Sequence, residues 1–97
     1  MDTLYRFRLN DDGTIETQVI EEYEEWRDRY RWRGKSCTCW VKKKNLDKMF
    51  VNGVYSFDPD KDRAKLIMIQ TLQSKAEECM KEYNKRMDMI HEIFNNN

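Results

Sequence analysis

The stretch DPDKDRAKLIMIQTLQSKAEECMKEYNKRMDMIHEIF, residues 58–94, decides the fold because it predicts one long C-terminal helix. Asp58 is a favourable N-cap, and Pro59 suits the first helical position. Asp60 and Asp62 complement the positive end of the helix dipole. No Gly or further Pro interrupts the stretch, so at 1.5 Å per residue the helix is ~54 Å long. A six-residue strand spans only ~20 Å, so we expect the helix to extend past any sheet that this chain forms.

Apolar residues recur along this helix at intervals of three and four, which predicts a continuous apolar stripe close to heptad spacing. We expect the first part of the stripe to pack on the sheet through Leu66, Ile69, Leu72 and Ala76. The distal part requires either a helix that folds back near Tyr83-Asn84 or a second helix to cover it. Self-association is favoured, and the helix of the dimer would use Met80, Tyr83, Met87, Ile90 and Phe94. Arg86 occupies a nominal core position, which counts against a strict coiled coil.

The chain ahead of the helix, residues 1–57, predicts short antiparallel strands because apolar and polar positions alternate between turn signals. Residues 4–9 place Tyr5, Phe7 and Leu9 on one face and two arginines on the other. Asp12-Gly13 predicts a hairpin turn in which both residues accept positive φ. The β-branched residues of 14–20 predict the return strand.

A second hairpin is predicted from residues 30–33 and 37–41, separated by Gly34-Lys35. Residues 42–45 are expected to form a loop, and residues 46–50 a short helical turn or loop. A tight turn at Asn52-Gly53 leads into a short strand at 54–57, and turns account for all three glycines. Residues 21–28 fit either a helical turn or a strand.

These elements predict an α+β fold, an antiparallel meander of four or five short strands followed by one long helix. We expect a single domain over residues 1–97, with a β-rich part at 1–57, the helix at 58–94 and a frayed end at 95–97. No apolar run approaches the ~18 residues that a membrane span needs. Charged residues near the N-terminus argue against a signal peptide, and an odd count of three cysteines indicates reduced thiols. A cytoplasmic location is expected.

Charge is segregated along the chain, although its 18 basic and 18 acidic residues cancel. Residues 16–25 carry five acids and no base, whereas residues 29–45 carry seven bases and no acid. Basic residues interleaved with Tyr30, Trp32 and Trp40 can bind single-stranded nucleic acid, because cations contact phosphates while bases stack on rings. The candidate nucleic-acid residues are Arg29, Arg31, Arg33, Lys42, Lys43 and Lys44. The alternative is a solvated face on which these arginines pair with glutamates across strands, with aromatic side chains inside and cations outside.

Metal binding and catalysis receive little support from the sequence. Cys37, Cys39, Cys79 and His91 form a nominal ligand set, but Cys79 and His91 are ~18 Å apart on a straight helix. The cysteines are therefore expected to be small buried hydrophobes, with no metal or cofactor. No glycine-rich phosphate loop, nucleophile motif or paired-histidine motif is present, so we predict that the protein is not an enzyme.

The residual features favour a protein-binding module. Short, charge-rich chains with a small sheet, a Tyr-Ser-Phe-Asp segment (residues 55–58) before a long helix and no catalytic motif resemble accessory proteins of Gram-positive phages and mobile elements. That resemblance implies binding and inhibition of a host protein such as a defence nuclease. An acidic patch with aromatic side chains, taken as exposed, could imitate nucleic acid towards a basic partner. Its residues are Glu21, Glu22, Tyr23, Glu24, Glu25 and Trp26.

Overall fold

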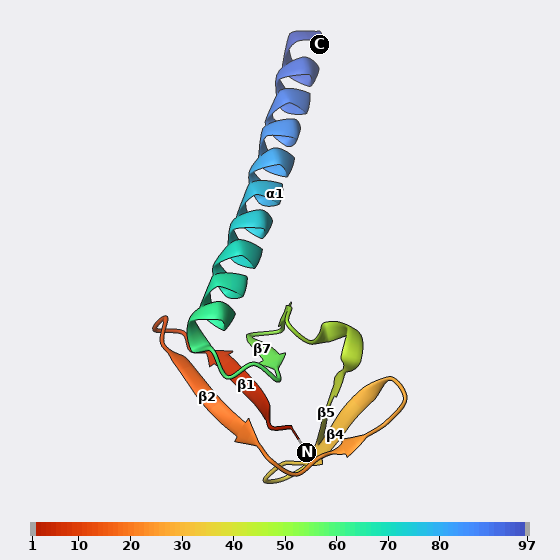
Figure 1. Cartoon of the computed structure of the whole chain (residues 1–97). Helices are drawn as coiled ribbons and strands as arrows, with labels where there is room; N and C mark the ends of the chain where they lie inside the picture. The colour runs from red at the N-terminus through yellow and green to blue at the C-terminus, as the bar shows by residue number, and fades with distance from the viewer. Residues whose placement is uncertain (1, 97) are drawn as a thin grey trace.

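The computed structural model describes residues 2–96 and shows the predicted α+β fold, with short antiparallel strands followed by one long C-terminal helix (Figure 1). One sheet has the order β2-β1-β7-β6, formed by Ile15–Ile20, Leu4–Leu9, Gly53–Ser56 and Met49–Phe50. The other has the order β3-β4-β5, formed by Glu24–Glu25, Arg29–Arg33 and Thr38–Lys42. A 3₁₀ turn, η1, covers Lys43–Asn45, and the helix α1 covers Lys61–Asn96.

The described residues thus hold seven strands, more than the four or five predicted. The two extra strands, β3 and β6, have two residues each, too few for alternation to be visible in the sequence. β3 shows that the undecided segment 21–28 is extended rather than helical. In the expected loop at 42–45, Lys42 ends β5 and the other residues form η1. Residues 46–48 form a turn, as expected, and β6 takes only the last two residues of the expected helical turn or loop at 46–50.

The first hairpin forms as predicted, with Leu4 paired to Ile20 and Leu9 paired to Ile15. In the connection Gly13 alone has positive φ, at 87°. Asp12 has no positive φ. Its carboxylate instead accepts hydrogen bonds from the backbone N–H and hydroxyl of Thr14, at 2.9 and 2.7 Å. The prediction of positive φ at both residues was therefore wrong for Asp12.

Gly53 has a role other than the predicted turn. Val51, at φ 57°, makes the left-handed turn between β6 and β7, and Gly53 lies in β7. A Cβ at Gly53 would lie 2.7 Å from the carbonyl oxygen of Phe7, which is closer than the Cβ atoms of real residues come to another heavy atom. Glycine is required here because β1 and β7 approach closely.

The core consists of two clusters on opposite faces of the four-stranded sheet. Successive side chains of a strand point to opposite faces, so Leu4 and Phe7 of β1 enter different clusters. Leu4 packs with Ile20, Trp32 and Val41, which joins the two sheets. Phe7 packs with Val54, Ala64 and Met68 of α1, together with Tyr5 and Leu9 as the alternation predicted.

The helix begins three residues later than predicted. Asp60 is its N-cap, because its carboxylate accepts hydrogen bonds from the backbone N–H groups of Asp62 and Arg63, at 3.0 and 3.4 Å. Asp58, the predicted cap, instead accepts a 2.9 Å hydrogen bond from the Asp60 N–H in the turn before the helix. Pro59 therefore precedes the helix as well. At the other end α1 includes Asn95 and Asn96, which were expected to fray, and Asn97 lies outside the described residues.

A polar network fixes the start of α1 to the sheet. The Asp47 carboxylate accepts hydrogen bonds from the Ser56 hydroxyl at 2.6 Å and the Arg63 guanidinium at 2.7 Å. Ser56 is buried at the end of β7, and its Oγ accepts a hydrogen bond from the Asp58 N–H. Burial raises the pKa of Asp47, but the hydrogen bonds from Ser56 and Arg63 and the charge of Arg63 outweigh it and hold this pKa below its usual value.

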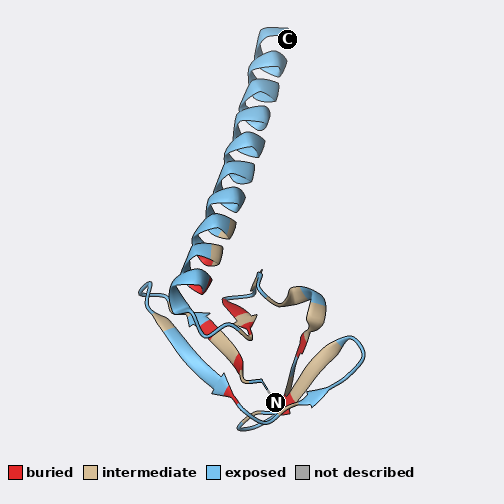
Figure 2. Ribbon diagram, viewed as in Figure 1, coloured by how far each residue is buried: buried red, intermediate tan, exposed pale blue. Residues whose placement is uncertain are grey.

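Only the first turns of α1 pack on the sheet, and through a different face from the one predicted. Ala64 and Met68 are buried, and Ile67 and Thr71 are half-buried. Leu66, Ile69, Leu72 and Ala76, which were expected to make this contact, are exposed. Every described residue after Thr71 is exposed, so the helix projects from the β part and the molecule is 66 Å long (Figures 1 and 2). No helix in residues 2–96 combines the length and the apolar character that crossing a membrane requires.

Candidate functional site

The surface of the β3-β4-β5 sheet that points away from the core, here called the outer face, gathers the basic side chains and two tryptophans. In β4, Tyr30 and Trp32 point inwards, where Tyr30 is half-buried and Trp32 is buried. By alternation the arginines of the same strand point outwards. Strand pairing places Arg31 between Glu24 and Trp40, Arg33 beside Thr38, and Arg29 beside Lys42. The arginines thus form the middle row of the outer face.

Two cation–π contacts organise this row. The Arg29 guanidinium lies over the Trp40 ring at 4.6 Å from its centroid, and the Arg31 guanidinium lies over the Trp26 ring at 5.1 Å. Trp26 is held in place because its backbone N–H donates to the Arg29 carbonyl at 2.8 Å and its indole N–H donates to Glu24 at 3.0 Å. Trp26 and Trp40 remain 46% and 50% exposed, so both rings can contact a ligand.

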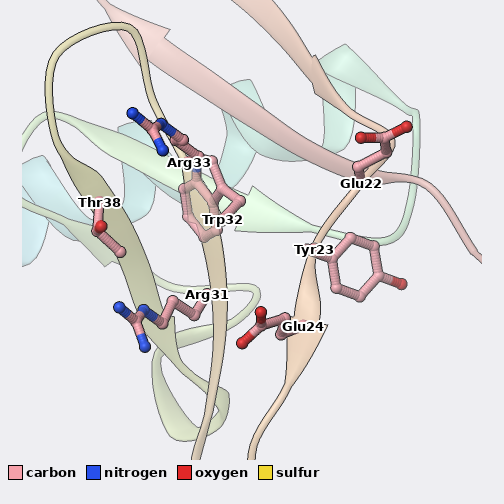
Figure 3. A pocket seen from close by; sticks show the side chains of 7 residues that line it. All are labelled: Glu22, Tyr23, Glu24, Arg31, Trp32, Arg33 and Thr38. Carbon is pink, nitrogen blue, oxygen red and sulfur yellow. The ribbon is translucent and has the colours of Figure 1, made fainter.

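Two shallow depressions on this sheet join into one surface. The first, of about 460 Å³, is shown in Figure 3 and is lined by Glu22, Tyr23, Glu24, Arg31, Trp32, Arg33 and Thr38. The second, of about 300 Å³, is lined by Trp26, Arg29, Arg31, Thr38 and Trp40. Both share Arg31 and Thr38, so a ligand could extend from one depression to the other. Arg31 therefore lies at the centre of the candidate site.

Acidic neighbours neutralise one end of the arginine row, at Arg29, and leave its centre and other end without ion pairs among the described residues. Asp28 forms a bidentate ion pair with Arg29, at 3.0 and 3.1 Å, and the hydrogen bond from Arg29 lowers the pKa of Asp28. Within residues 2–96, no ion pair joins Arg31 or Arg33 to a carboxylate. The alternative in which the arginines pair with glutamates across strands therefore does not hold for Arg31, although Glu24 lies opposite it.

The predicted acidic patch is divided by the fold. Glu21 and Glu22 are exposed, but Glu24 accepts the Trp26 indole hydrogen bond and Glu25 pairs with Lys43 at 3.2 Å. Tyr23 is half-buried rather than exposed, because it packs edge-on against Tyr30 and contacts Phe57. Its hydroxyl donates to the Asp2 carbonyl at 2.6 Å, and burial raises its pKa. Trp26 is therefore the one exposed aromatic side chain of this patch.

The three lysines of residues 42–44 lie at one edge of the same sheet. They line a shallow depression of about 360 Å³ together with Asp28. The Lys43 ammonium lies 5.2 Å from the Tyr30 ring centroid and is paired with Glu25, whereas Lys44 is exposed. Residues 22–44 carry eight basic and four acidic side chains, so this segment has a net charge of +4 and the rest of the chain −4.

Residues 2–96 contain no group of three His, Cys, Asp or Glu side chains that could hold a metal ion. Cys37, Cys39 and Cys79 are free thiols. Only Cys39 is partly buried, which raises its pKa, so the expectation of buried cysteines was wrong for Cys37 and Cys79. His91 is exposed on the projecting part of α1.

The two candidate surfaces coincide in the structure, which the sequence did not predict. The sequence predicts separate acidic and basic sites, yet Glu24 and Trp26 lie directly beside Arg31. The two-residue turn at Arg27-Asp28 brings them together. Thr38 was also missed, although its alternation with Trp40 in a five-residue strand was available as a signal.

The chain matches no protein-family model, no curated protein and no solved structure. The outer face itself is therefore the basis for assigning a function.

Proposed function

We propose that this chain is a non-enzymatic binding protein whose outer face binds single-stranded nucleic acid. The observation that supports this most directly is the pair of half-exposed tryptophans, Trp26 and Trp40, on either side of a row of arginines. Stacking rings next to cations are the chemistry that single-stranded nucleic-acid sites share. Free thiols fit the cytoplasmic location that this proposal includes.

Binding would use the rings and the cations at the same time. Trp26 and Trp40 lie two strand spacings apart, with β4 between them, and are offset by two residues along the strands, which separates their Cα atoms by about 12 Å. In the free protein each ring is covered by a guanidinium on one side. A base stacks on the exposed ring surface, while Arg31 and Arg33, which have no carboxylate partner within residues 2–96, contact phosphates. Duplex bases are already stacked on each other, so we expect a duplex to bind more weakly than a single strand.

The test is fluorescence anisotropy of labelled single-stranded and double-stranded oligonucleotides over a series of salt concentrations. We expect micromolar affinity for single strands that falls log-linearly with salt, by about 0.7 log units per phosphate contact. Arg31→Ala should weaken binding and reduce this slope by about 0.7. Trp40→Ala should weaken binding without reducing the slope, because it removes stacking and not charge.

Lys65→Ala is the matched control, because Lys65 is an exposed cation on α1, outside the outer face. It changes the net charge as Arg31→Ala does and should leave affinity unchanged. The proposal is rejected if no single strand binds at low salt, or if Lys65→Ala weakens binding as much as Arg31→Ala.

A second candidate function is binding to a protein, including inhibition of a host protein such as a defence nuclease. The observation that favours it is the position of exposed Glu21 and Glu22 ahead of a surface with Trp and Arg, the residue types that dominate protein interfaces. Replacing Glu21, Glu22, Glu24 and Glu25 by Lys should abolish binding to a basic partner. Unchanged partner binding by that variant would reject this candidate.

A further inference from the structure

The exposed apolar stripe of α1 lies on a different side of the helix from the residues that contact the sheet. The helix turns by 100° per residue, which places the centre of the stripe about 120° around the axis from Ala64, Ile67 and Met68. Even near the sheet, the stripe residues Leu66, Ile69 and Leu72 are about half-exposed. The sheet therefore cannot cover the stripe, and something else must.

The stripe has the size of a protein interface. In heptad notation it occupies positions a, d and e over 26 residues, from Ile69 to Phe94, except for Gln73 at one e position and Arg86 at one d position. Leu66 is one further e position before it. Its large side chains are between 36% exposed, for Met87, and 84% exposed, for Phe94. With ~200 Å² for an aromatic and ~90 Å² for an aliphatic side chain, these fractions give roughly 600 Å² of exposed apolar surface per chain. A homodimer interface of standard size buries about 800 Å² per partner, of which about 65% is apolar.

We propose that two copies of this chain pair through the stripe as antiparallel helices centred on residue 81. This inference depends on α1 and is independent of the outer face. With that centre, every a position meets a d position of the other copy, since their residue numbers add up to 162. Ile69 lies opposite the partner's Ile93, Leu72 opposite the partner's Ile90, and Cys79 opposite the partner's Tyr83.

Arg86 favours the antiparallel pairing over the parallel one. In a parallel pair in register, Arg86 would face its own copy at a core position, so two like charges would be desolvated together. In the antiparallel pair Arg86 lies opposite the partner's Ala76, the smallest side chain of the stripe, which leaves room for its stem. Glu82 precedes Arg86 by four residues on the same helix, the spacing and order at which opposite charges attract.

The e positions fit the same arrangement. Antiparallel helices bring e positions of the two copies together at residue numbers that add up to 160, so Met80 meets the partner's Met80 and Leu66 meets the partner's Phe94. Gln73, the one polar e position, meets the partner's Met87. Leu66 and Phe94 are both exposed in the single chain. The pairing thus covers both ends of the stripe, including the most exposed of its side chains.

Disulfide trapping tests the orientation. In a background with Cys37, Cys39 and Cys79 replaced by Ser, Met80→Cys should form a cross-linked dimer under mild oxidation. Ile69→Cys is the matched variant and should not, because its two copies would be ~36 Å apart along antiparallel helices and a disulfide requires Cα atoms within about 7 Å. Cross-linking of Ile69→Cys but not Met80→Cys would indicate a parallel pair and would overturn the proposal.

Sedimentation equilibrium tests the association itself, with all native cysteines reduced. At high micromolar concentration we expect a mass of twice 11.9 kDa. Ile90→Glu, in the stripe, should reduce the mass to one chain, whereas Lys81→Glu, on the opposite side of the helix, should not. Circular dichroism checks that each variant keeps its helix. A single-chain mass for the native protein, a larger assembly, or no effect of Ile90→Glu in a folded variant would each refute the dimer.

Discussion

Met68→Ala and Ile69→Ala are neighbouring substitutions for which the structure predicts opposite outcomes. Met68 is 2% exposed, and it packs with Phe7, Val54 and Ala64 in the cluster that joins α1 to the sheet. Truncating a buried Met to Ala costs about 2–5 kcal/mol, from lost burial and the cavity left behind. Ile69 is 42% exposed, and Ala has the higher helix propensity, so we expect Ile69→Ala to cost less than about 1 kcal/mol.

The size of this difference makes it easy to measure. A chain of this length has a free energy of unfolding of about 5–15 kcal/mol, and each 1 kcal/mol lowers the Tm of a small domain by about 4–8 °C. Met68→Ala at a cost of about 3 kcal/mol should therefore lower the Tm by about 12–24 °C. Urea unfolding, followed by the fluorescence of the tryptophans, should show a lower midpoint and an unchanged slope.

Both substitutions belong in an Ile90→Glu background, so that helix pairing does not contribute to the measured stability. The reasoning would be refuted if Ile69→Ala cost as much as Met68→Ala. That result would mean that the stripe packs on the sheet, as the heptad pattern alone predicted, and that the face containing Ala64 and Met68 does not.

Two further substitutions test the contact between β1 and β7 and the polar network at the start of α1. Gly53→Ala should destabilise the protein by about 1–3 kcal/mol in urea unfolding, because its Cβ would lie 2.7 Å from a backbone oxygen of β1; an unchanged midpoint would contradict the close approach. Asp47→Asn should lower stability at pH 7 by weakening the bonds from Ser56 and Arg63. Because folding lowers the pKa of Asp47, its contribution is complete above the unfolded value of about 3.9 and is lost as pH falls through the folded pKa. The difference in unfolding free energy between native and variant proteins should therefore shrink below about pH 4, and a constant difference would count against this role.

The elements with strong local signals could be predicted from the sequence. β1 has the predicted residues Leu4–Leu9, and α1 differs from the prediction by two or three residues at each end. The helix start was misplaced because Asp58 and Asp60 are both good caps. In the structure Asp58 caps the turn before the helix, and Asp60 caps the helix itself. The prediction of which face of α1 packs on the sheet was wrong for a related reason. Periodicity identifies an apolar face but does not say which surface covers it.

Only part of the candidate site could be predicted from the sequence. Alternation correctly predicted that Trp32 points inwards and Arg31 and Arg33 outwards. Alternation could not place Trp26, because β3 is too short to show a period. The hairpin at Arg27-Asp28, closed by the hydrogen bond from the Trp26 N–H to the Arg29 carbonyl, is seen only in the structure. The pairing of each tryptophan with an arginine also depends on strand register, which no single strand encodes by itself.

The projecting helix has a hydrodynamic consequence. The radius of gyration is 19.2 Å, whereas a compact chain of this length has about 13 Å. Such an elongated particle diffuses slowly for its mass, so on gel filtration a single chain would elute ahead of globular standards of its own mass. An early elution volume is therefore no measure of association for this protein. Its oligomeric state has to be determined by a method that measures mass rather than hydrodynamic radius.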